Sequence, residues 1–333
     1  MNLRILKGYG KAVENSVKNS FHDFYEQKQS FYSFDFPLAI EWGEAGRVQK
    51  YASEQLRYAL FDGEKPIGLF QGLVNRKFLI STLAAGSTSG NGIIVYPTYG
   101  KRALAFFVSA ILKKEGFSTT SIFVPSYVTL PGFSVKKNYT YHIDLAEPME
   151  NILSRMTKEC RWAIRKAEKS QVKVEISDSE DLLEEAYSIV AHTANAKNVG
   201  APSLDWIREL HAKFSTCGHS ISAIARHGCT PVSAGYFLGY DGKLSWFIGG
   251  SKSEGYKLQA GNVVQMKVIE WAKKHGYRIY DMGGTHPIDI RYSKIHKFKS
   301  GFGGCLASNY VLCRNEFYWP FLLRISGLLH YIC

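Results

Sequence analysis

The sequence predicts an α/β protein built from two tandem copies of one strand–helix unit. Two hairpin signals of similar composition lie at residues 61–74 and 226–238. Each has a turn that contains glycine, then a proline, and then an apolar run rich in β-forming residues, which is typical of a β-hairpin. An amphipathic segment with the same kind of ending follows each hairpin, at residues 103–116 and 263–276. The repeated order and spacing of these signals predict a duplication.

The end residues support each predicted element. Pro66 and Pro231 stand at strand starts, where a proline removes no hydrogen-bond donor from the sheet. Both helices end in lysines, then a glycine (Gly116 and Gly276), then an aromatic residue. Lysine favours the negative end of a helix, and glycine favours the position just after it. Chance similarity between two common patterns is the alternative explanation.

The boundary between the two copies is predicted near residues 136–145, where Tyr139, Tyr141 and Ile143 alternate as in a strand. One helix is expected next, over residues 149–170. The expected division of the chain is a first lobe at 1–145, a second lobe at 146–312 and an aromatic, amphipathic tail at 313–333.

Two more helices are expected in the second lobe. They cover residues 179–193 and 203–214, and Ser203 is a good N-cap for the second of them.

Length and composition indicate an ordinary globular protein. The 333 residues are enough for two domains, with 45% hydrophobic and 21% charged residues. No uncharged apolar run reaches the ~18 residues that a membrane span needs, and the first residues do not resemble a secretory signal. The six cysteines contain no Cys-x-x-Cys pair, so neither a disulfide framework nor a zinc site is indicated. We therefore expect a cytoplasmic protein.

The charge balance favours a polyanionic partner. Lys and Arg outnumber Asp and Glu by 41 to 29, a formal net charge of +12. Nucleic acid, a phosphorylated substrate or an anionic membrane face would suit such an excess. A merely basic soluble protein is the alternative.

The most specific motifs lie near the end of the second lobe. Tyr-Asp-Met-Gly-Gly occupies residues 280–284, and Phe-Lys-Ser-Gly-Phe-Gly-Gly occupies residues 298–304. With the predicted strand and basic helix of residues 141–174, these motifs resemble proteins of the FemABX family, over roughly residues 30–312. Those proteins are aminoacyl-tRNA-dependent peptidyltransferases with two lobes of the GNAT acyltransferase fold. The resemblance implies two tandem GNAT-like lobes, each a mixed sheet flanked by helices, without the coiled-coil insertion of the best-known members.

Lys299 and Asp281 are the candidate catalytic residues. The resemblance implies that Lys299 stabilises the negative charge that develops on the acyl donor; a lysine at a strand end with surface contacts is the alternative. Asp281, at the end of a predicted strand and before Gly283 and Gly284, could orient the acceptor amine or accept its proton. It could equally cap the loop through local backbone N–H groups. No nucleophile is assigned, because the chain has no Gly-x-Ser-x-Gly elbow and no convincing Cys/His pair.

The candidate substrate-binding residues lie beside the motifs or on the basic helix. Lys158, Arg161 and Arg165 recur at helical spacing and could bind phosphates, although a solvated helix face is the alternative. The others are two aromatic residues beside the motifs and glycines that permit close backbone approach: Phe298, Trp246, Gly283, Gly284 and Gly303.

The expected donor is aminoacyl-tRNA, used as a co-substrate without a bound cofactor or metal. Acetyl-CoA or acyl-CoA is less expected, because Ala260 and Asn262 replace two glycines of the pyrophosphate-binding signature at residues 257–262. The leading interpretation is a transferase that adds an aminoacyl group to an amine of a cell-envelope or peptide-like precursor, with a nucleotide- or lipid-linked acceptor. The alternatives are an acyl-CoA-dependent N-acyltransferase acting on a sugar or small amine, and a non-catalytic module that binds RNA or a membrane. Whether the tail at 313–333 packs on the core or touches the inner face of the membrane is left open.

Overall fold

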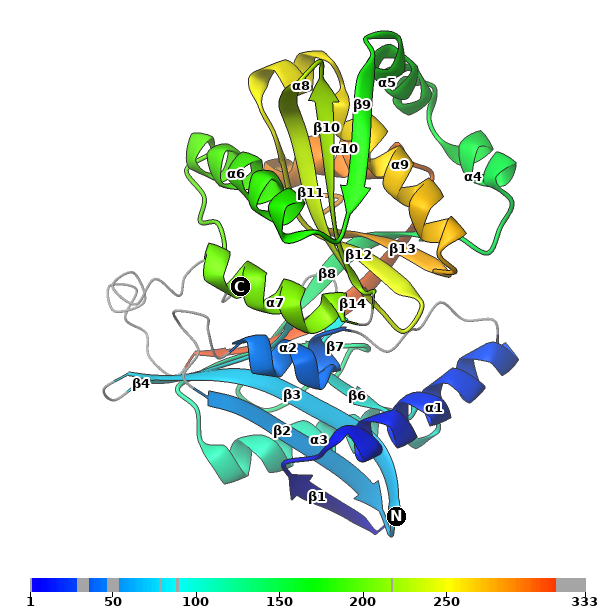
Figure 1. Cartoon of the computed structure of the whole chain (residues 1–333). Helices are drawn as coiled ribbons and strands as arrows, with labels where there is room; N and C mark the ends of the chain where they lie inside the picture. Colours follow the sequence, from blue (N-terminus) through cyan, green and yellow to red (C-terminus); the bar gives the residue numbers. More distant parts are fainter. Residues whose placement is uncertain are drawn as a thin grey trace. The chain divides into compact units, whose positions relative to one another are not determined.

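The chain forms two compact units in the computed structural model, which describes residues 2–28, 36–46, 54–77, 80–87, 90–216 and 218–315 (Figure 1). Unit 1 consists of Met1–Asn138 together with Ser308–Cys333, and unit 2 is Tyr139–Ala307. This division differs from the two contiguous lobes expected from the sequence, because unit 1 is built from two separate parts of the chain. Most of the tail expected at 313–333 lies outside the described residues.

The main path of the unit 1 sheet runs β1, β2, β3, β4, β7 and β14. Neighbouring strands on this path are antiparallel except β4 and β7, which are parallel. Two short strands add to it, β5 on β4 and β6 on β3. The strands are β1 (Leu3–Lys7), β2 (Glu54–Asp62), β3 (Lys65–Lys77), β4 (Ile80–Ser87), β5 (Gly90–Asn91), β6 (Ile93–Val95), β7 (Thr119–Val124) and β14 (Cys305–Asn315).

The helix α3 (Gly100–Glu115) supplies one layer of the unit 1 core. Leu104, Phe107 and Ile111 recur at helical spacing and are buried in the same cluster as side chains from the sheet. Gly116 ends the helix with φ +61°, a left-handed conformation that favours glycine. The expected helix and its glycine end are therefore confirmed. A 3₁₀ turn, η3 (Pro97–Tyr99), precedes it.

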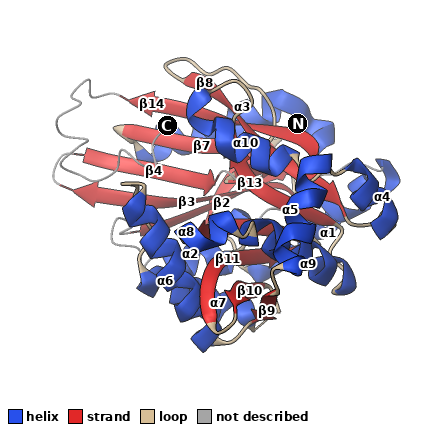
Figure 2. Cartoon of the chain, turned by 90° about the horizontal axis from the view of Figure 1, so that it is seen from above, coloured by secondary structure: helices blue, strands red, loops and turns tan. Residues whose placement is uncertain are grey.

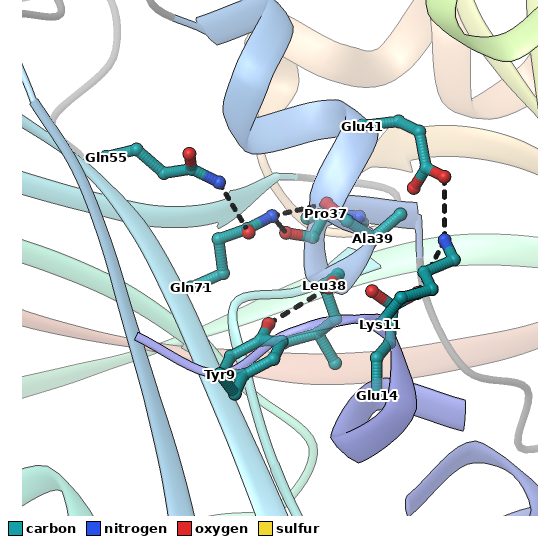
Figure 3. Close-up of polar contacts among 9 residues, drawn as sticks. All are labelled: Tyr9, Lys11, Glu14, Pro37, Leu38, Ala39, Glu41, Gln55 and Gln71. Atoms are coloured by element: carbon teal, nitrogen blue, oxygen red, sulfur yellow. Dashed lines mark hydrogen bonds and ion pairs between the residues drawn. The ribbon is translucent and has the colours of Figure 1, made fainter. Parts of the chain in front are cut away.

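Gln71 of β3 forms hydrogen bonds with the short segment at residues 37–39 (Figure 3). Its buried amide donates hydrogen bonds to the carbonyl oxygens of Pro37 and Ala39, at 2.9 and 2.6 Å. Its own side-chain oxygen accepts from Gln55 Nε2 at 2.9 Å. Because the Gln71 side chain is buried, these bonds satisfy amide atoms that would otherwise be desolvated without a partner. The remaining helical elements of unit 1 are α1 (Lys11–Lys28), η1 (Phe36–Leu38) and α2 (Ile40–Ala45).

The unit 2 sheet runs β8, β13, β12, β11, β10 and β9. Its neighbouring strands are antiparallel except β12 and β13, which are parallel. The strands are β8 (Ser134–Asp144), β9 (Val172–Ser177), β10 (Ser220–His227), β11 (Thr230–Tyr240), β12 (Lys243–Ser251) and β13 (Ile279–Thr285).

Helices cover both faces of the unit 2 sheet (Figures 1 and 2). On one face α6 (Glu180–Ala196) packs against Ile224. On the other, α9 (Ala260–Lys274) packs against Ile221 and Ala223. Successive side chains of a strand point to opposite faces, so these residues of β10 identify the two layers.

The duplication predicted from the hairpins is visible in the backbone of each unit. The β2–β3 and β10–β11 turns contain Gly63 and Gly228, with φ +59° and +58°. A register shift follows each turn, where Pro66 pairs with Phe61 and Pro231 pairs with Arg226. In both units a helix, α3 or α9, then leads to a strand that joins the sheet in parallel.

The last strand of each repeat is exchanged. The segment that follows β7 is β8, and it pairs with β13 of unit 2 through residues 139–144. The segment that follows β13 and α10 (Ser293–Ser300) is β14, and it pairs with β7 of unit 1 through residues 310–315. The sheet of unit 2 therefore receives β8, which follows β7 of unit 1 in the sequence. The sheet of unit 1 receives β14, which follows β13 of unit 2.

The single helix expected at 149–170 is wrong. The structure has α4 (Met149–Arg155) and α5 (Lys158–Lys169), with a break at Met156 and Thr157. The Thr157 hydroxyl accepts a hydrogen bond from Cys160 N at 3.2 Å, so an N-cap starts a new helix where the amphipathic pattern alone reads as continuous. The two further helices are confirmed as α6 and α7 (Leu204–Ser215), and Ser203 caps α7 as predicted.

Candidate functional site

The site is built where β12 and β13 separate in unit 2. These strands pair only through Lys243–Ile279, Leu244–Tyr280 and Ser245–Asp281. Beyond that point β12 continues along β11 and β13 continues along β8. A bulge opposite Tyr236 and Phe237 bends β12 at the same place. The backbones therefore part after Ser245 and leave room between two strands for a side chain from outside the sheet.

Lys299 of α10 enters this opening. Its Nζ atom donates a hydrogen bond to the carbonyl oxygen of Gly284 in β13, at 2.7 Å. The same atom lies 4.9 Å from the ring centroid of Trp246, the first β12 residue past the last pair. The ammonium group thus contacts both strands after they have parted. The alternative of a lysine at a strand end with surface contacts is wrong, because Lys299 lies in a helix and its side chain is only 5% exposed.

Burial changes the proton affinity of Lys299. Removal of the charged amine from water lowers its pKa from 10.5 to about 8, and the negative charge of Asp281 acts in the opposite direction. At neutral pH the side chain is therefore still mainly an ammonium ion, but one that titrates much closer to neutrality than a surface lysine.

Asp281 lies at the centre of a buried polar network. One carboxylate oxygen accepts from the Thr140 hydroxyl and from Gly283 N at 2.8 Å. The other lies 3.4 Å from His142 Nε2 and 3.8 Å from Lys243 Nζ. With 1% of its side chain exposed, Asp281 contacts the chain's own groups rather than solvent.

These contacts keep Asp281 ionised. Burial alone would raise its pKa, but the nearby His142 and Lys243 and the hydrogen bonds outweigh burial and lower the pKa to about 2. The structure supports the loop-capping alternative for this residue, because Asp281 binds the backbone of Gly283 directly. Through Gly283 and Gly284 it positions the carbonyl group that holds Lys299.

The motif glycines approach the chain's own backbone. A Cβ atom added at Gly303, whose φ is +72°, would lie 2.5 Å from the carbonyl oxygen of Arg155. One added at Gly304 would lie 2.8 Å from the carbonyl oxygen of His142. Gly283 also has a positive φ, +74°, within the irregular part of β13. These glycines let the turn after α10 pack closely, which fixes the end of the helix that carries Lys299.

Arg161 holds two helices together. Its Nη1 donates to the carbonyl oxygen of Met156 and, at 3.3 and 3.4 Å, to those of Leu153 and Ser154. These are carbonyl groups at the end of α4, where the last turn of a helix has no following N–H groups in the helical pattern; that of Leu153 also accepts from Met156 N at 3.3 Å. The guanidinium group is therefore occupied by a capping role, and phosphate binding would require it to share that role.

The rest of the expected basic stripe faces solvent. Lys158 and Arg165 are exposed on α5, and Lys169 continues their face. Between them Trp162 is 55% exposed, and Lys166 Nζ lies 5.3 Å from its ring centroid. An exposed aromatic ring among cations suits a nucleic acid, since bases stack on such rings and phosphates bind the cations.

Phe298 packs against other aromatic rings of the site and does not line an open surface. It is partly buried, and its ring centroid lies 6.0 Å from that of Trp246 and 5.4 Å from that of Phe302. It therefore packs the ring that Lys299 contacts.

Thr140, His142 and Lys243 were not found from the sequence. His142 lies directly opposite Asp281 in the β8–β13 register, and Lys243 lies on the other neighbouring strand. The alternation in β8 separates Thr140 and His142 from the tyrosines, but nothing in the sequence indicates that β8 pairs with β13. Only the exchanged strand order brings these side chains to Asp281.

Comparisons with known proteins agree with this architecture. Residues 154–294 match the family model described as an acetyltransferase (GNAT) domain. No curated protein sequence matches the chain. The solved structure of FemX is 14% identical, with a TM-score of 0.69 over 96% of this chain and 99% of that one.

Two other solved structures share the fold at lower similarity. The C-terminal domain of a protein described as a lysylphosphatidylglycerol synthetase, from Agrobacterium fabrum, is 12% identical with a TM-score of 0.55, over 91% of this chain and 93% of that one. A tandem GNAT protein from the clavulanic acid biosynthesis pathway is 10% identical with a TM-score of 0.54, over 93% of this chain and 97% of that one. At these identities the likeness concerns the fold. The tandem GNAT architecture of the FemX type, predicted from the motifs, is thereby confirmed.

Proposed function

We propose that the protein is an acyltransferase that moves an aminoacyl group from aminoacyl-tRNA to an amine of a cell-envelope or other peptide-like precursor. The observation that carries the proposal is the position of the Lys299 ammonium group, buried in the opening between β12 and β13. A GNAT domain model over residues 154–294 and the fold of FemX support the acyltransferase class. The aminoacyl donor and the acceptor are the parts of the proposal that need experiment.

The reaction needs a group that stabilises negative charge. The acceptor amine attacks the ester carbonyl, a C–N bond forms, the C–O bond to the tRNA ribose breaks, and the amine proton ends on the ribose oxygen. Lys299 has three N–H donors. Within the described residues one of them is used by Gly284, so the others can bind the oxygen that becomes negative. Charge stabilisation in a water-poor site is a large contribution to catalysis.

Asp281 has a positioning role in this scheme. Its pKa is too low for it to accept a proton at neutral pH, and its carboxylate already accepts a hydrogen bond from Gly283 N. We therefore assign the proton transfer to no protein group. Its contribution is to fix Gly283 and Gly284, and hence the Lys299 amine.

The α5 surface is the proposed binding face for tRNA. Lys158 and Arg165 would bind phosphates, and Trp162 would stack on an unpaired base. We expect Trp162→Ala to weaken tRNA affinity about 10-fold, since base stacking on an aromatic side chain is worth ~1–3 kcal/mol. Tyr127→Ala, which removes a ring that is 47% exposed, is the matched control. Equal affinities for the two variants would show that α5 is a solvated face.

The decisive experiment compares two acyl donors, and it compares the unmodified protein with a Lys299 variant. Purified protein is given an amine acceptor with charged tRNA or with acetyl-CoA, and product formation is measured. We expect transfer from tRNA, and a loss of about 100- to 1000-fold in kcat for Lys299→Met. Lys274→Met, at an exposed lysine, should retain full activity. Transfer from the thioester alone would reject the tRNA donor, and full activity of Lys299→Met would reject the site.

An acyl-CoA-dependent N-acyltransferase is the second candidate. The match of residues 154–294 to an acetyltransferase domain favours it. The same assay distinguishes the two, because only the donor changes. Salt-sensitive RNA affinity without turnover from either donor would instead indicate a binding module.

A further inference from the structure

The loop between β13 and α10 exposes two isoleucines to an unusual degree. Ile288 and Ile290 are each 84% exposed. Among the large apolar side chains whose exposure the structure describes, none of the others exceeds 55%. Tyr292, 43% exposed, lies two residues further on. Single exposed apolar residues are normal on a protein surface, but two isoleucines separated by one residue and both mostly in water indicate an interaction surface.

The loop that presents them is held in a defined conformation. The Nδ1 atom of His286 accepts hydrogen bonds from Ile288 N at 3.4 Å and Asp289 N at 3.0 Å. The His286 ring packs edge-on against Tyr139, with centroids 5.2 Å apart. Asp289 caps the 3₁₀ turn η4 (Ile290–Tyr292) by accepting from Arg291 N at 2.9 Å. The isoleucines therefore project from a braced loop rather than from a chain end.

Basic residues follow the two isoleucines in the sequence. Residues 286–297 contain Arg291, Lys294 and Lys297 against the one acidic residue Asp289, a formal net charge of +2 (three minus one). Lys294 and Lys297 are exposed and lie one helical turn apart on α10, so they share a face. Arg291 pairs with Asp289, which leaves the two lysines as the local positive charge.

We infer that this loop, residues 286–292, docks the protein on an anionic lipid membrane, with Ile288 and Ile290 inserted among the lipids and Lys294 and Lys297 against the headgroups. Buried apolar area and attraction to anionic lipid are the two contributions that bind peripheral proteins to membranes. Charge complementarity favours a membrane over a second copy of this basic chain. Among the described residues, none of the helices has the length and hydropathy of a membrane span.

The inference goes beyond the proposed function, because it concerns where the site is held and not which donor it uses. The loop begins two residues after Gly284, the partner of Lys299, and leads directly into α10. A docked loop would bring the opening at Lys299 to the membrane surface, where a lipid-linked amine is found.

Co-sedimentation with vesicles tests the inference without any turnover. The full chain is mixed with vesicles of phosphatidylglycerol and phosphatidylcholine, or of phosphatidylcholine alone, at low and high salt. We expect binding to the anionic vesicles that weakens at high salt. Ile288→Ser/Ile290→Ser should lower the affinity about 10- to 100-fold, and Lys294→Gln/Lys297→Gln should remove most of the preference for anionic lipid.

Val199→Ser is the matched control, since Val199 is 52% exposed elsewhere on unit 2. It should bind as the unmodified protein does, and circular dichroism should show that all variants are folded. Unchanged vesicle binding by the isoleucine variant would overturn the inference. So would sedimentation velocity showing self-association that this variant abolishes, because the loop would then be a protein interface.

Discussion

Lys299 Nζ lies 2.7 Å from the carbonyl oxygen of Gly284, so a buried ammonium ion is held by a strand that has just left its neighbour. The buried charge of Lys299 has two opposite consequences. Its charge is useful for binding a developing oxyanion, and the same charge is costly to bury.

The first prediction concerns that cost. In the folded protein the pKa of Lys299 is about 8, below its ordinary value of 10.5, because of burial. Between these values the unfolded chain binds more protons, so the Lys299 contribution to stability rises with pH from about 8 to 10.5. Below pH 8 the cost of the buried charge is on the order of 3 kcal/mol. Lys299→Met should therefore be at least as stable as the unmodified protein at pH 7, measured by urea unfolding. The stability difference between the two should shrink towards pH 10, and parallel pH profiles would contradict this.

The second prediction concerns the use of the charge. If the ammonium form stabilises the reacting oxygen, kcat/KM should fall as pH rises through about 8, the pKa at which Lys299 loses its proton. Lys299→Arg retains a positive charge at every accessible pH. This variant should keep part of the activity and lose the alkaline fall. An increase in activity through pH 8 would mean that the neutral amine is the working form.

The third prediction concerns Asp281. Its pKa of about 2 lies below the ordinary 3.8, so its stabilising contribution is present above pH 3.8 and is lost as pH falls towards 2. Asp281→Asn removes the buried negative charge that lies 3.8 Å from Lys243 Nζ, and we expect a loss of about 3 kcal/mol at pH 7. Asp205→Asn, at a side chain that is 77% exposed, should change stability by about 0.5 kcal/mol or less. A difference between Asp281→Asn and the unmodified protein that stays constant from pH 5 to pH 2 would argue against this network.

The fourth prediction compares two glycines. Gly303→Ala combines a φ of +72° with a Cβ 2.5 Å from the Arg155 carbonyl oxygen. Strain of this kind costs about 1–3 kcal/mol or more. Gly200→Ala meets no atom within 4 Å and should be neutral or slightly stabilising. Thermal unfolding of both variants gives the comparison, and a tolerated Gly303→Ala would mean that the turn after α10 can relax.

The turns and helix ends of the repeated unit were predicted better from the sequence than the α4–α5 region between the two repeats. The two proline-containing hairpins and the glycine after α3 depend on local turn and cap chemistry, which neighbouring residues determine. The break at Thr157 was missed because an N-cap threonine inside an amphipathic run looks like continuous helix. The role of Arg161 was missed because capping depends on that break.

The candidate site shows the same limit. Lys299 and Asp281 were found through motifs, but their surroundings were not. His142 is 139 residues from Asp281 in the sequence and directly opposite it in the sheet. No periodicity connects strands at that separation, so the network around Asp281 could be read only from the strand order.

The exchange of β8 and β14 sets the order in which the protein can be completed during synthesis. Unit 1 begins the chain, but the part of β14 that pairs with β7, residues 310–315, is synthesised after all of unit 2. Until then β7 has an open edge, which is a hazard for pairing with other chains. Contacts between distant parts of a chain also form slowly. The N-terminal unit is therefore the last to close, and a nascent chain stopped before residue 305 should need a chaperone to stay soluble.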